Sequence, residues 1–85
     1  MTRNELQEKI LTILKNDFEF DHPGLKDNLR DDHGFDSIDA IELLAKIEKI
    51  LGFSIAREEK EKAMSIRTVN DILDYIEALV AARNN

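Results

Sequence analysis

The sequence of 85 residues contains no cysteine and no tryptophan, and it has only one proline and three glycines. Without cysteine the chain has no disulfide framework, no thiol nucleophile and no thiolate metal site. No apolar run approaches the roughly 18 residues of a membrane-spanning helix. Because the first residues are polar, we expect no signal peptide and therefore a protein of the cytoplasm.

Basic residues are also in the minority, with 12 lysines and arginines against 18 aspartates and glutamates and a formal net charge of −6. This balance argues against nucleic acid as a partner, because its phosphates require a basic surface. An acidic surface suits partners with basic patches, and it also keeps a small domain soluble. The length predicts one domain over residues 1–85, which we expect to be a monomer.

Hydrophobic periodicity predicts an all-α protein, because apolar residues recur at helical spacing and no segment alternates as a strand does. Longer helices are expected at 2–16, at 37–51 and after residue 68, with a short, marginal helix at 57–64. The predicted fold is a small four-helix bundle with a long loop between its first and second helices. Residues 81–85 are expected to fray.

Three residue pairs at a spacing of three predict where the longer helices begin. They are Thr2 with Glu5, Asp36 with Asp39, and Thr68 with Asp71. Gly52 follows the second long helix at the position where a helix commonly ends in the left-handed conformation.

The connection at 17–36 is unusually long for so small a domain. Phe18, Phe20, Leu25 and Leu29 are its expected anchors in the core. We expect a turn at 22–24 and a short turn of helix at 25–29.

The segment 37–51 carries two apolar faces on a helical wheel. Its broad inner face is expected to join the core and consists of Ala40, Leu43, Leu44, Ile47, Ile50 and Leu51. A narrower strip of Ile38, Ile41 and Ala45 lies on the other side among charged residues. Such a strip is typical of a docking face, although scattered surface aliphatics are also common.

Ser37 stands in the first turn of this segment and has no capping role, because Asp36 occupies the N-cap position. We therefore expect its hydroxyl to be free in water.

Catalytic and metal-binding arrangements are not apparent. His22 and His33 lie in the loop, where we expect solvent exposure or weak contacts, and no third group completes a serine–histidine pair. No spacing matches a zinc site, an EF-hand or a phosphate-cradling glycine loop. We expect a protein that is not an enzyme and holds no metal.

Residues 32–43, Asp-His-Gly-Phe-Asp-Ser-Ile-Asp-Ala-Ile-Glu-Leu, resemble the attachment site of acyl carrier proteins. That family's pattern is Asp-Leu-Gly, one residue, then Asp-Ser-Leu and a helix rich in aliphatic and acidic residues. Residues 52–55 and 65–76 are similar to the family's segment after its second helix and to its last helix. The resemblance covers the chain from end to end.

The resemblance implies a role for each matched position. Ser37 would take a 4′-phosphopantetheine group, whose thiol carries an acyl chain as a thioester in fatty-acid or related lipid or polyketide biosynthesis. Phosphopantetheinyl transferase and the acyl-loading, elongating and transferring enzymes would meet Asp36, Ile38, Asp39, Ile41, Glu42 and Ala45. The walls of the acyl pocket would be Leu44, Ile47, Ile55 and Ala63.

Four residues depart from the family pattern. His33 replaces a leucine, Phe35 replaces a small residue, and Lys46 and Lys49 add positive charge to a helix that is usually more acidic. These departures suggest a carrier dedicated to one pathway. Two other functions stay open, namely a carrier of an aminoacyl or peptidyl cargo, and an unmodified helical adaptor that binds through Ile38, Ile41 and Ala45.

Overall fold

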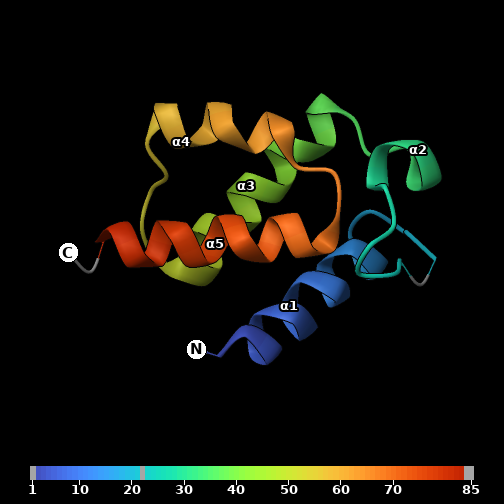
Figure 1. Ribbon diagram of the computed structural model, residues 1–85, viewed down its shortest axis with the longest axis horizontal. Coiled ribbons are helices and arrows are strands. Elements are labelled where there is room, and N and C mark those ends of the chain that lie inside the picture. The colour runs from blue at the N-terminus through green and yellow to red at the C-terminus, as the bar shows by residue number, and fades with distance from the viewer. Residues whose placement is uncertain (1, 22, 84–85) are drawn as a thin grey trace.

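The computed structural model describes residues 2–21 and 23–83, and within them all regular structure is helical. Figure 1 shows the arrangement, in which α5 lies between α1 and α4 and α2 sits at one end of the molecule. The elements in chain order are α1 (Arg3–Asn16), α2 (Leu29–His33), α3 (Ser37–Leu51), α4 (Arg57–Lys62), the 3-10 turn η1 (Ala63–Ser65) and α5 (Val69–Arg83). The all-α prediction is confirmed.

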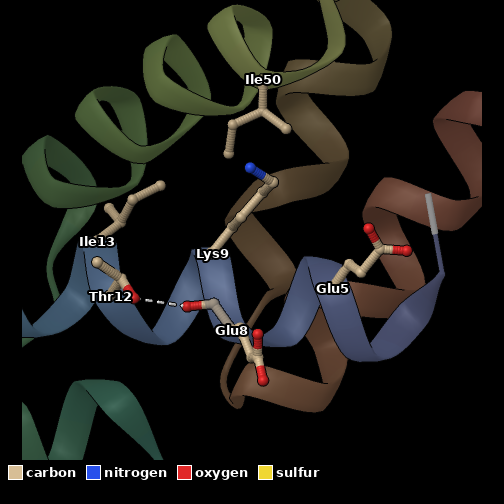
Figure 2. Close-up of a pocket in the computed structure, with 6 residues that line it drawn as sticks. All are labelled: Glu5, Glu8, Lys9, Thr12, Ile13 and Ile50. Carbon is tan, nitrogen blue, oxygen red and sulfur yellow. Dashed lines mark hydrogen bonds between the residues drawn. The ribbon is translucent and has the colours of Figure 1, made fainter.

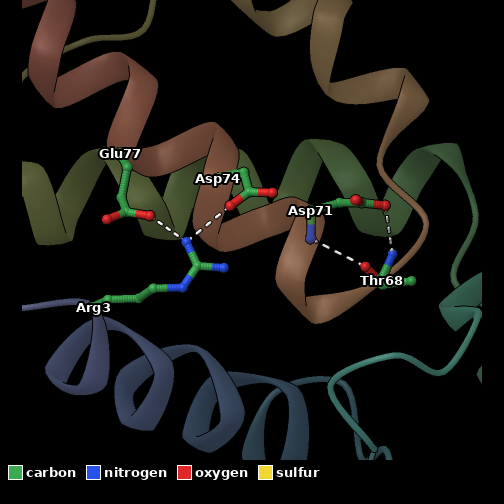
Figure 3. Close-up of polar contacts among 5 residues, drawn as sticks. All are labelled: Arg3, Thr68, Asp71, Asp74 and Glu77. Atoms are coloured by element: carbon green, nitrogen blue, oxygen red, sulfur yellow. Dashed lines mark hydrogen bonds and ion pairs between the residues drawn. The ribbon is translucent and has the colours of Figure 1, made fainter.

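The three predicted caps are present. At α1, the backbone N–H of Glu5 donates to the Thr2 hydroxyl at 3.2 Å, and the Thr2 N–H donates to the Glu5 carboxylate at 3.1 Å. At α5, the N–H of Asp71 donates to the Thr68 hydroxyl at 3.1 Å, and the Asp71 carboxylate accepts from the Thr68 N–H (Figure 3). These short-range bonds satisfy backbone donors that the helices leave free at their first turns.

A single guanidinium joins the two terminal helices on the surface. Figure 3 shows the Arg3 side chain of α1 reaching across to two carboxylates of α5, those of Asp74 and Glu77. The Asp74 oxygen lies 2.8 Å from the guanidinium nitrogen. The hydrogen bond to Asp74, and after it the bond to Glu77, raises the pKa of Arg3 above its ordinary value. The contact aligns the two helices while their apolar faces supply the packing.

One hydrophobic core runs through the bundle, and α3 and α5 together contribute half of its buried residues. From α5 the buried residues are Val69, Ile72, Leu73, Ile76 and Leu79. From α3 they are Ala40, Leu43, Leu44 and Ile47, which confirms the inner half of the predicted face. Ile50 and Leu51 are only half-buried, because they lie in the last turn of α3.

The loop at 17–36 differs from the prediction in its helical turn. The short helix α2 spans Leu29–His33 rather than 25–29, so the described residues contain five α-helices instead of four. Asn28 determines its start, because its side chain accepts hydrogen bonds from the N–H groups of Arg30 and Asp31. Gly34, with φ of 70°, ends it in the left-handed conformation that glycine adopts most easily.

The same loop confirms its predicted anchors. Phe20 and Leu29 are buried, while Phe18 and Leu25 pack against the core from partly exposed positions. A turn lies at 24–27, where the N–H of Asp27 donates to the carbonyl of Gly24. The Asp27 carboxylate accepts from the N–H of Gly24 at 2.8 Å, which closes the turn there. His22, on which the predicted turn at 22–24 depends, and residues 84–85 lie outside the described residues. Residues 81–83, the rest of the segment expected to fray, are helical and form the end of α5.

The segment predicted as one short helix at 57–64 is divided between α4 and η1. None of the six α4 residues is buried, and its N-cap residue Ala56 offers no side-chain hydrogen bond. Ala63 of η1 is buried and attaches the segment to the core. Without a cap or an apolar face, α4 cannot continue as a regular helix through η1. In the described part of the chain, no helix has the length and apolar character needed to cross a membrane.

Candidate functional site

The start of α3 is a reciprocal capping box made by two aspartates. The N–H of Asp39 donates to the Asp36 carboxylate at 3.0 Å, and the N–H of Asp36 donates to the Asp39 carboxylate at 3.2 Å. The cap is therefore complete without the residue that directly follows Asp36 in the first turn.

That residue is Ser37, and its side chain is exposed. Within 2–21 and 23–83, nothing forms a hydrogen bond with its hydroxyl. The prediction of a free hydroxyl is confirmed. The N-terminus of a helix carries partial positive charge, which favours a phosphate attached there.

An aromatic cluster holds the loop that leads into this site. Phe35 is buried two residues before Ser37, and its ring packs edge-on to Phe18 and Phe20 with centroid distances of 6.2 Å. The Phe35 N–H donates to the carbonyl of Leu29 at 3.0 Å. The bulky residue at position 35 thus points into the core, and the exposed side of the loop is left to Asp36 and Ser37.

His33 belongs to the same cluster and is not solvent-exposed as expected. Its ring stacks on Phe20 at 5.4 Å between centroids, and its side chain is 15% exposed. Its Nε2 lies 3.6 Å from the Asp27 carboxylate and forms no hydrogen bond in the described structure. The position follows from α2, which turns residue 33 toward the core, and the loop assignment in the sequence could not indicate it.

The outer face of α3 carries the predicted apolar strip. Ile38 is 66% exposed and Ile41 is 62% exposed, and Ala45 is exposed on the same face. Asp36 and Glu42 are exposed beside them, and Asp39 is half-buried in the capping box. The strip is therefore accessible to a partner over its whole length, and it begins next to Ser37.

The four predicted wall residues of the acyl pocket are all buried in the core. Their exposed fractions are 4% for Leu44, 0% for Ile47, 5% for Ile55 and 3% for Ala63. Two polar contacts hold this region. The N–H of Ile55 donates to the Glu48 carboxylate at 2.7 Å, and the Tyr75 hydroxyl donates to the carbonyl of Glu59 in α4 at 2.6 Å.

An open hollow lies elsewhere, between α1 and α3 (Figure 2). It measures about 550 Å³ and is lined by Glu5, Glu8, Lys9, Thr12, Ile13 and Ile50. In Figure 2, Lys9 points toward Ile50, and the Thr12 hydroxyl donates to the Glu8 carbonyl. None of the predicted site residues lines it, so this open hollow is a separate surface feature.

The two lysines that depart from the family pattern have different surroundings. The Lys46 ammonium lies 3.2 Å from the carboxylate of Asp17 at the end of α1. Lys49 is exposed, and in the described chain no carboxylate pairs with it. Of the two positive charges, only the one at position 49 is left for a partner.

An unengaged serine hydroxyl at a helix N-terminus, beside an exposed apolar and acidic helix face, is typical of a small helical carrier domain. Comparison with protein families agrees, since residues 5–76 match the model described as "Phosphopantetheine attachment site". The chain therefore belongs to the acyl carrier protein family of phosphopantetheine-attachment domains. As a member, it carries acyl chains on a 4′-phosphopantetheine prosthetic group.

Several curated relatives are similar over most of their length. An acyl carrier protein of Phytoplasma australiense is 38% identical over 76 residues, which cover 87% of this chain and 96% of the relative. An acyl carrier protein of Thermosynechococcus vestitus is 33% identical over 84 residues, covering 96% of this chain and all of the relative. The chain thus corresponds to these relatives nearly from end to end.

Proposed function

We propose that Ser37 is the residue that carries the prosthetic group. The observation that supports this is the free hydroxyl of Ser37 beside a cap that Asp36 and Asp39 complete without it. In the attachment reaction the Ser37 oxygen would bond to the phosphopantetheine phosphorus of coenzyme A. The pyrophosphate bond would break, 3′,5′-ADP would leave, and the serine proton would pass to a base of the transferase.

The chain's own residues would position this group and would not catalyse a reaction. Asp36 and Asp39 hold the first turn of α3 so that the serine faces solvent, and the partial positive charge of the helix start offsets the phosphodiester charge. When attached, the group supplies a thiol that forms the thioester with the cargo. We expect the protein to act as a monomer in the cytoplasm.

The partner enzymes would dock on the outer face of α3. Ile38, Ile41 and Ala45 offer accessible apolar surface. Asp36, Asp39 and Glu42 offer negative charge that steers partners with basic surfaces. We assign this face to phosphopantetheinyl transferase and to acyl-loading, elongating and transferring enzymes.

The cargo would lie among Leu44, Ile47, Ile55 and Ala63. These side chains are packed together in the core, so an acyl chain has to move α4 and η1 to enter. Each buried CH₂ group contributes about 0.8 kcal/mol. A few methylene groups are therefore enough to offset the contacts that hold so short a helix. Because Lys49 leaves the helix less acidic than is usual in the family, we propose a carrier dedicated to a particular pathway.

Two alternative functions would use the same residues but differ in whether Ser37 is modified. A carrier of aminoacyl or peptidyl cargo would be modified at Ser37 as well, and the loading enzyme would set the cargo. An adaptor that binds through Ile38, Ile41 and Ala45 would never be modified. Modification of the serine separates the adaptor from both carriers.

The test is incubation with coenzyme A and a broad-specificity phosphopantetheinyl transferase, followed by intact-mass measurement. We expect the wild-type protein to gain one phosphopantetheine and Ser37→Ala to gain none. Ser65→Ala is the matched control, because Ser65 is also exposed and lies outside the outer face of α3. It should be modified like the wild type. A wild-type protein that gains no mass, or a Ser37→Ala variant that does, would overturn the proposal.

A further inference from the structure

The outer strip of α3 does not end at Ala45. It continues into a shallow hollow of about 380 Å³ at the end of the helix, lined by Ala45, Glu48, Lys49, Gly52, Phe53 and Ser54. Ile38, Ile41, Ala45 and Lys49 follow one another at intervals of three or four residues, which places them along one side of the helix. The half-buried Phe53 gives the hollow an apolar floor next to Lys49.

The free charge changes sign along this strip. Beside Ser37, the exposed carboxylates of Asp36 and Glu42 have no cationic partner within 2–21 and 23–83. At the other end, Lys49 is exposed and unpaired in the same part of the chain, and the Arg83 guanidinium lies 4.3 Å above the centroid of the Phe53 ring.

The carboxylate of Glu48, at the far end of the strip, already has two partners within the protein. Glu48 accepts a hydrogen bond from the N–H of Ile55 at 2.7 Å, and its other oxygen lies 4.0 Å from the Lys60 ammonium. It keeps its negative charge, but its side chain is only 25% exposed and Lys60 balances that charge. What a partner meets in this hollow is the positive charge of Lys49 and Arg83 around an apolar ring.

The acidic and basic ends of the strip are far enough apart to act on a partner's charges separately. Along the helix axis Lys49 lies about 20 Å from Asp36 and about 10 Å from Glu42. Both separations exceed the screening length of about 8 Å at physiological ionic strength, the second by a small margin. A charge on a partner opposite Lys49 is therefore affected mainly by Lys49 and only weakly by the acids near Ser37.

We propose that the outer face of α3 is a docking surface with two charge signs, which selects enzymes with a matching pattern. This inference rests on the proposed function. The fitting enzyme surface is basic where it faces Asp36 and Glu42, and it presents an acidic and an apolar side chain to the Lys49–Phe53 hollow. A uniformly basic surface places like charge against Lys49 and binds less well.

The test compares two variants that change the net charge equally. Lys49→Glu replaces the positive charge of the strip with a negative one, so that the strip carries negative charge at both ends. Lys15→Glu makes the same change on α1, at an exposed lysine with no ion pair among the described residues. The probe is a phosphopantetheinyl transferase with a uniformly basic carrier-binding surface, and the readout is kcat/KM for modification. We expect Lys49→Glu to raise kcat/KM at least threefold above Lys15→Glu at about 50 mM salt, and the gain to vanish at about 0.5 M. Equal effects of the two variants would overturn the inference.

A second measurement addresses the partner's acidic side chain directly. Each basic residue of the transferase docking surface is reversed to glutamate and paired with wild-type protein and with Lys49→Glu. We expect at least one reversal that favours the wild type and disfavours Lys49→Glu, and a scan without any such reversal would contradict the inference. Failure of the wild type to gain phosphopantetheine would instead overturn the proposed function. Normal modification with no effect specific to position 49 would overturn only the inference.

Discussion

The helices α5 and α4 lie side by side in Figure 1 but are held in the molecule by different forces. Five of the 15 residues of α5 are buried in the core, and its start has a side-chain cap. None of the six residues of α4 is buried, and its start has no such cap. Apolar burial therefore fixes α5, while α4 depends on its neighbours.

Two polar contacts attach α4 to its neighbouring helices, and η1 adds a buried residue and a carbonyl, that of Met64, which accepts from Arg30 and Arg67. The Tyr75 hydroxyl of α5 donates to the Glu59 carbonyl at 2.6 Å, and the Lys60 ammonium lies 4.0 Å from the Glu48 carboxylate of α3. Ala63 supplies the buried apolar contact. Such contacts are individually weak, so α4 is the element expected to yield first when a cargo enters.

The largest expected effect is on the free energy of unfolding, when a core residue of α5 is replaced and compared with a surface residue of α4. Replacing the fully buried Ile76 of α5 with alanine should lower the free energy of unfolding by about 2–5 kcal/mol, because it removes buried methylenes and leaves a cavity. Replacing the exposed Glu58 of α4 with alanine should change it by less than about 0.5 kcal/mol. Urea titrations of both variants measure the difference. Similar losses would mean that α4 shares in the cooperative core.

A smaller effect concerns the cap of α5. Thr68→Ala should lower the free energy of unfolding by about 1 kcal/mol, because the Asp71 N–H loses its side-chain acceptor. Thermal unfolding by circular dichroism measures the loss. Thr12→Ala, which removes a hydroxyl from the exposed middle of α1, is the control and should stay close to the wild type. A Thr68→Ala variant as stable as this control would contradict the role of the cap.

Removing the Tyr75 hydroxyl tests whether its hydrogen bond holds α4 in place. Tyr75→Phe should cost about 1 kcal/mol, and amide hydrogen exchange at 57–65 should accelerate more than exchange in α5. Uniform acceleration over both segments would show that the bond stabilises the whole bundle and does not act on α4 in particular.

Because the same hydroxyl can lose its proton, we expect the free energy of unfolding to fall at alkaline pH. Burial, and after it the charges of Glu59 and Glu48, raises the pKa of Tyr75 from 10.0 to about 12. The contribution of the protonated hydroxyl is therefore complete below pH 10 and is lost as the pH rises through about 12. Between these values the wild type should lose more stability than Tyr75→Phe, as urea titrations at several pH values would measure. Parallel losses would contradict the prediction.

The smallest expected effect is a gain. Ala56→Asp should give α4 the cap that it lacks and raise the free energy of unfolding by about 0.5–1 kcal/mol. Amide exchange at 57–62 should slow, while exchange in α5 should stay unchanged. Ala56→Gly is the control, because it adds no charge or side-chain acceptor. Equal exchange rates in the two variants would show that the start of α4 does not limit its opening.

The prediction from sequence was most accurate where structure depends on neighbours in the chain. The start of α3 and the free hydroxyl of Ser37 follow from Asp36 and Asp39, which lie three residues apart, and the end of α3 follows from Gly52. The prediction placed the short helical turn of the loop at 25–29 instead of 29–33, although Asn28 and Gly34 are the cap signals that delimit α2. Its five residues are too few to show a helical period, so only the caps indicate it.

The sequence by itself determined where the longer helices begin, which of their faces are apolar and which serine is left without a partner. Only the tertiary structure decided that His33 stacks on Phe20, that Asp17 neutralises Lys46 while Lys49 stays free, and that Tyr75 holds α4. The physical reason is distance along the chain. Helix caps and periodicity act between residues a few positions apart, whereas these pairs span between 13 and 29 positions and exist only once the core has brought the helices together.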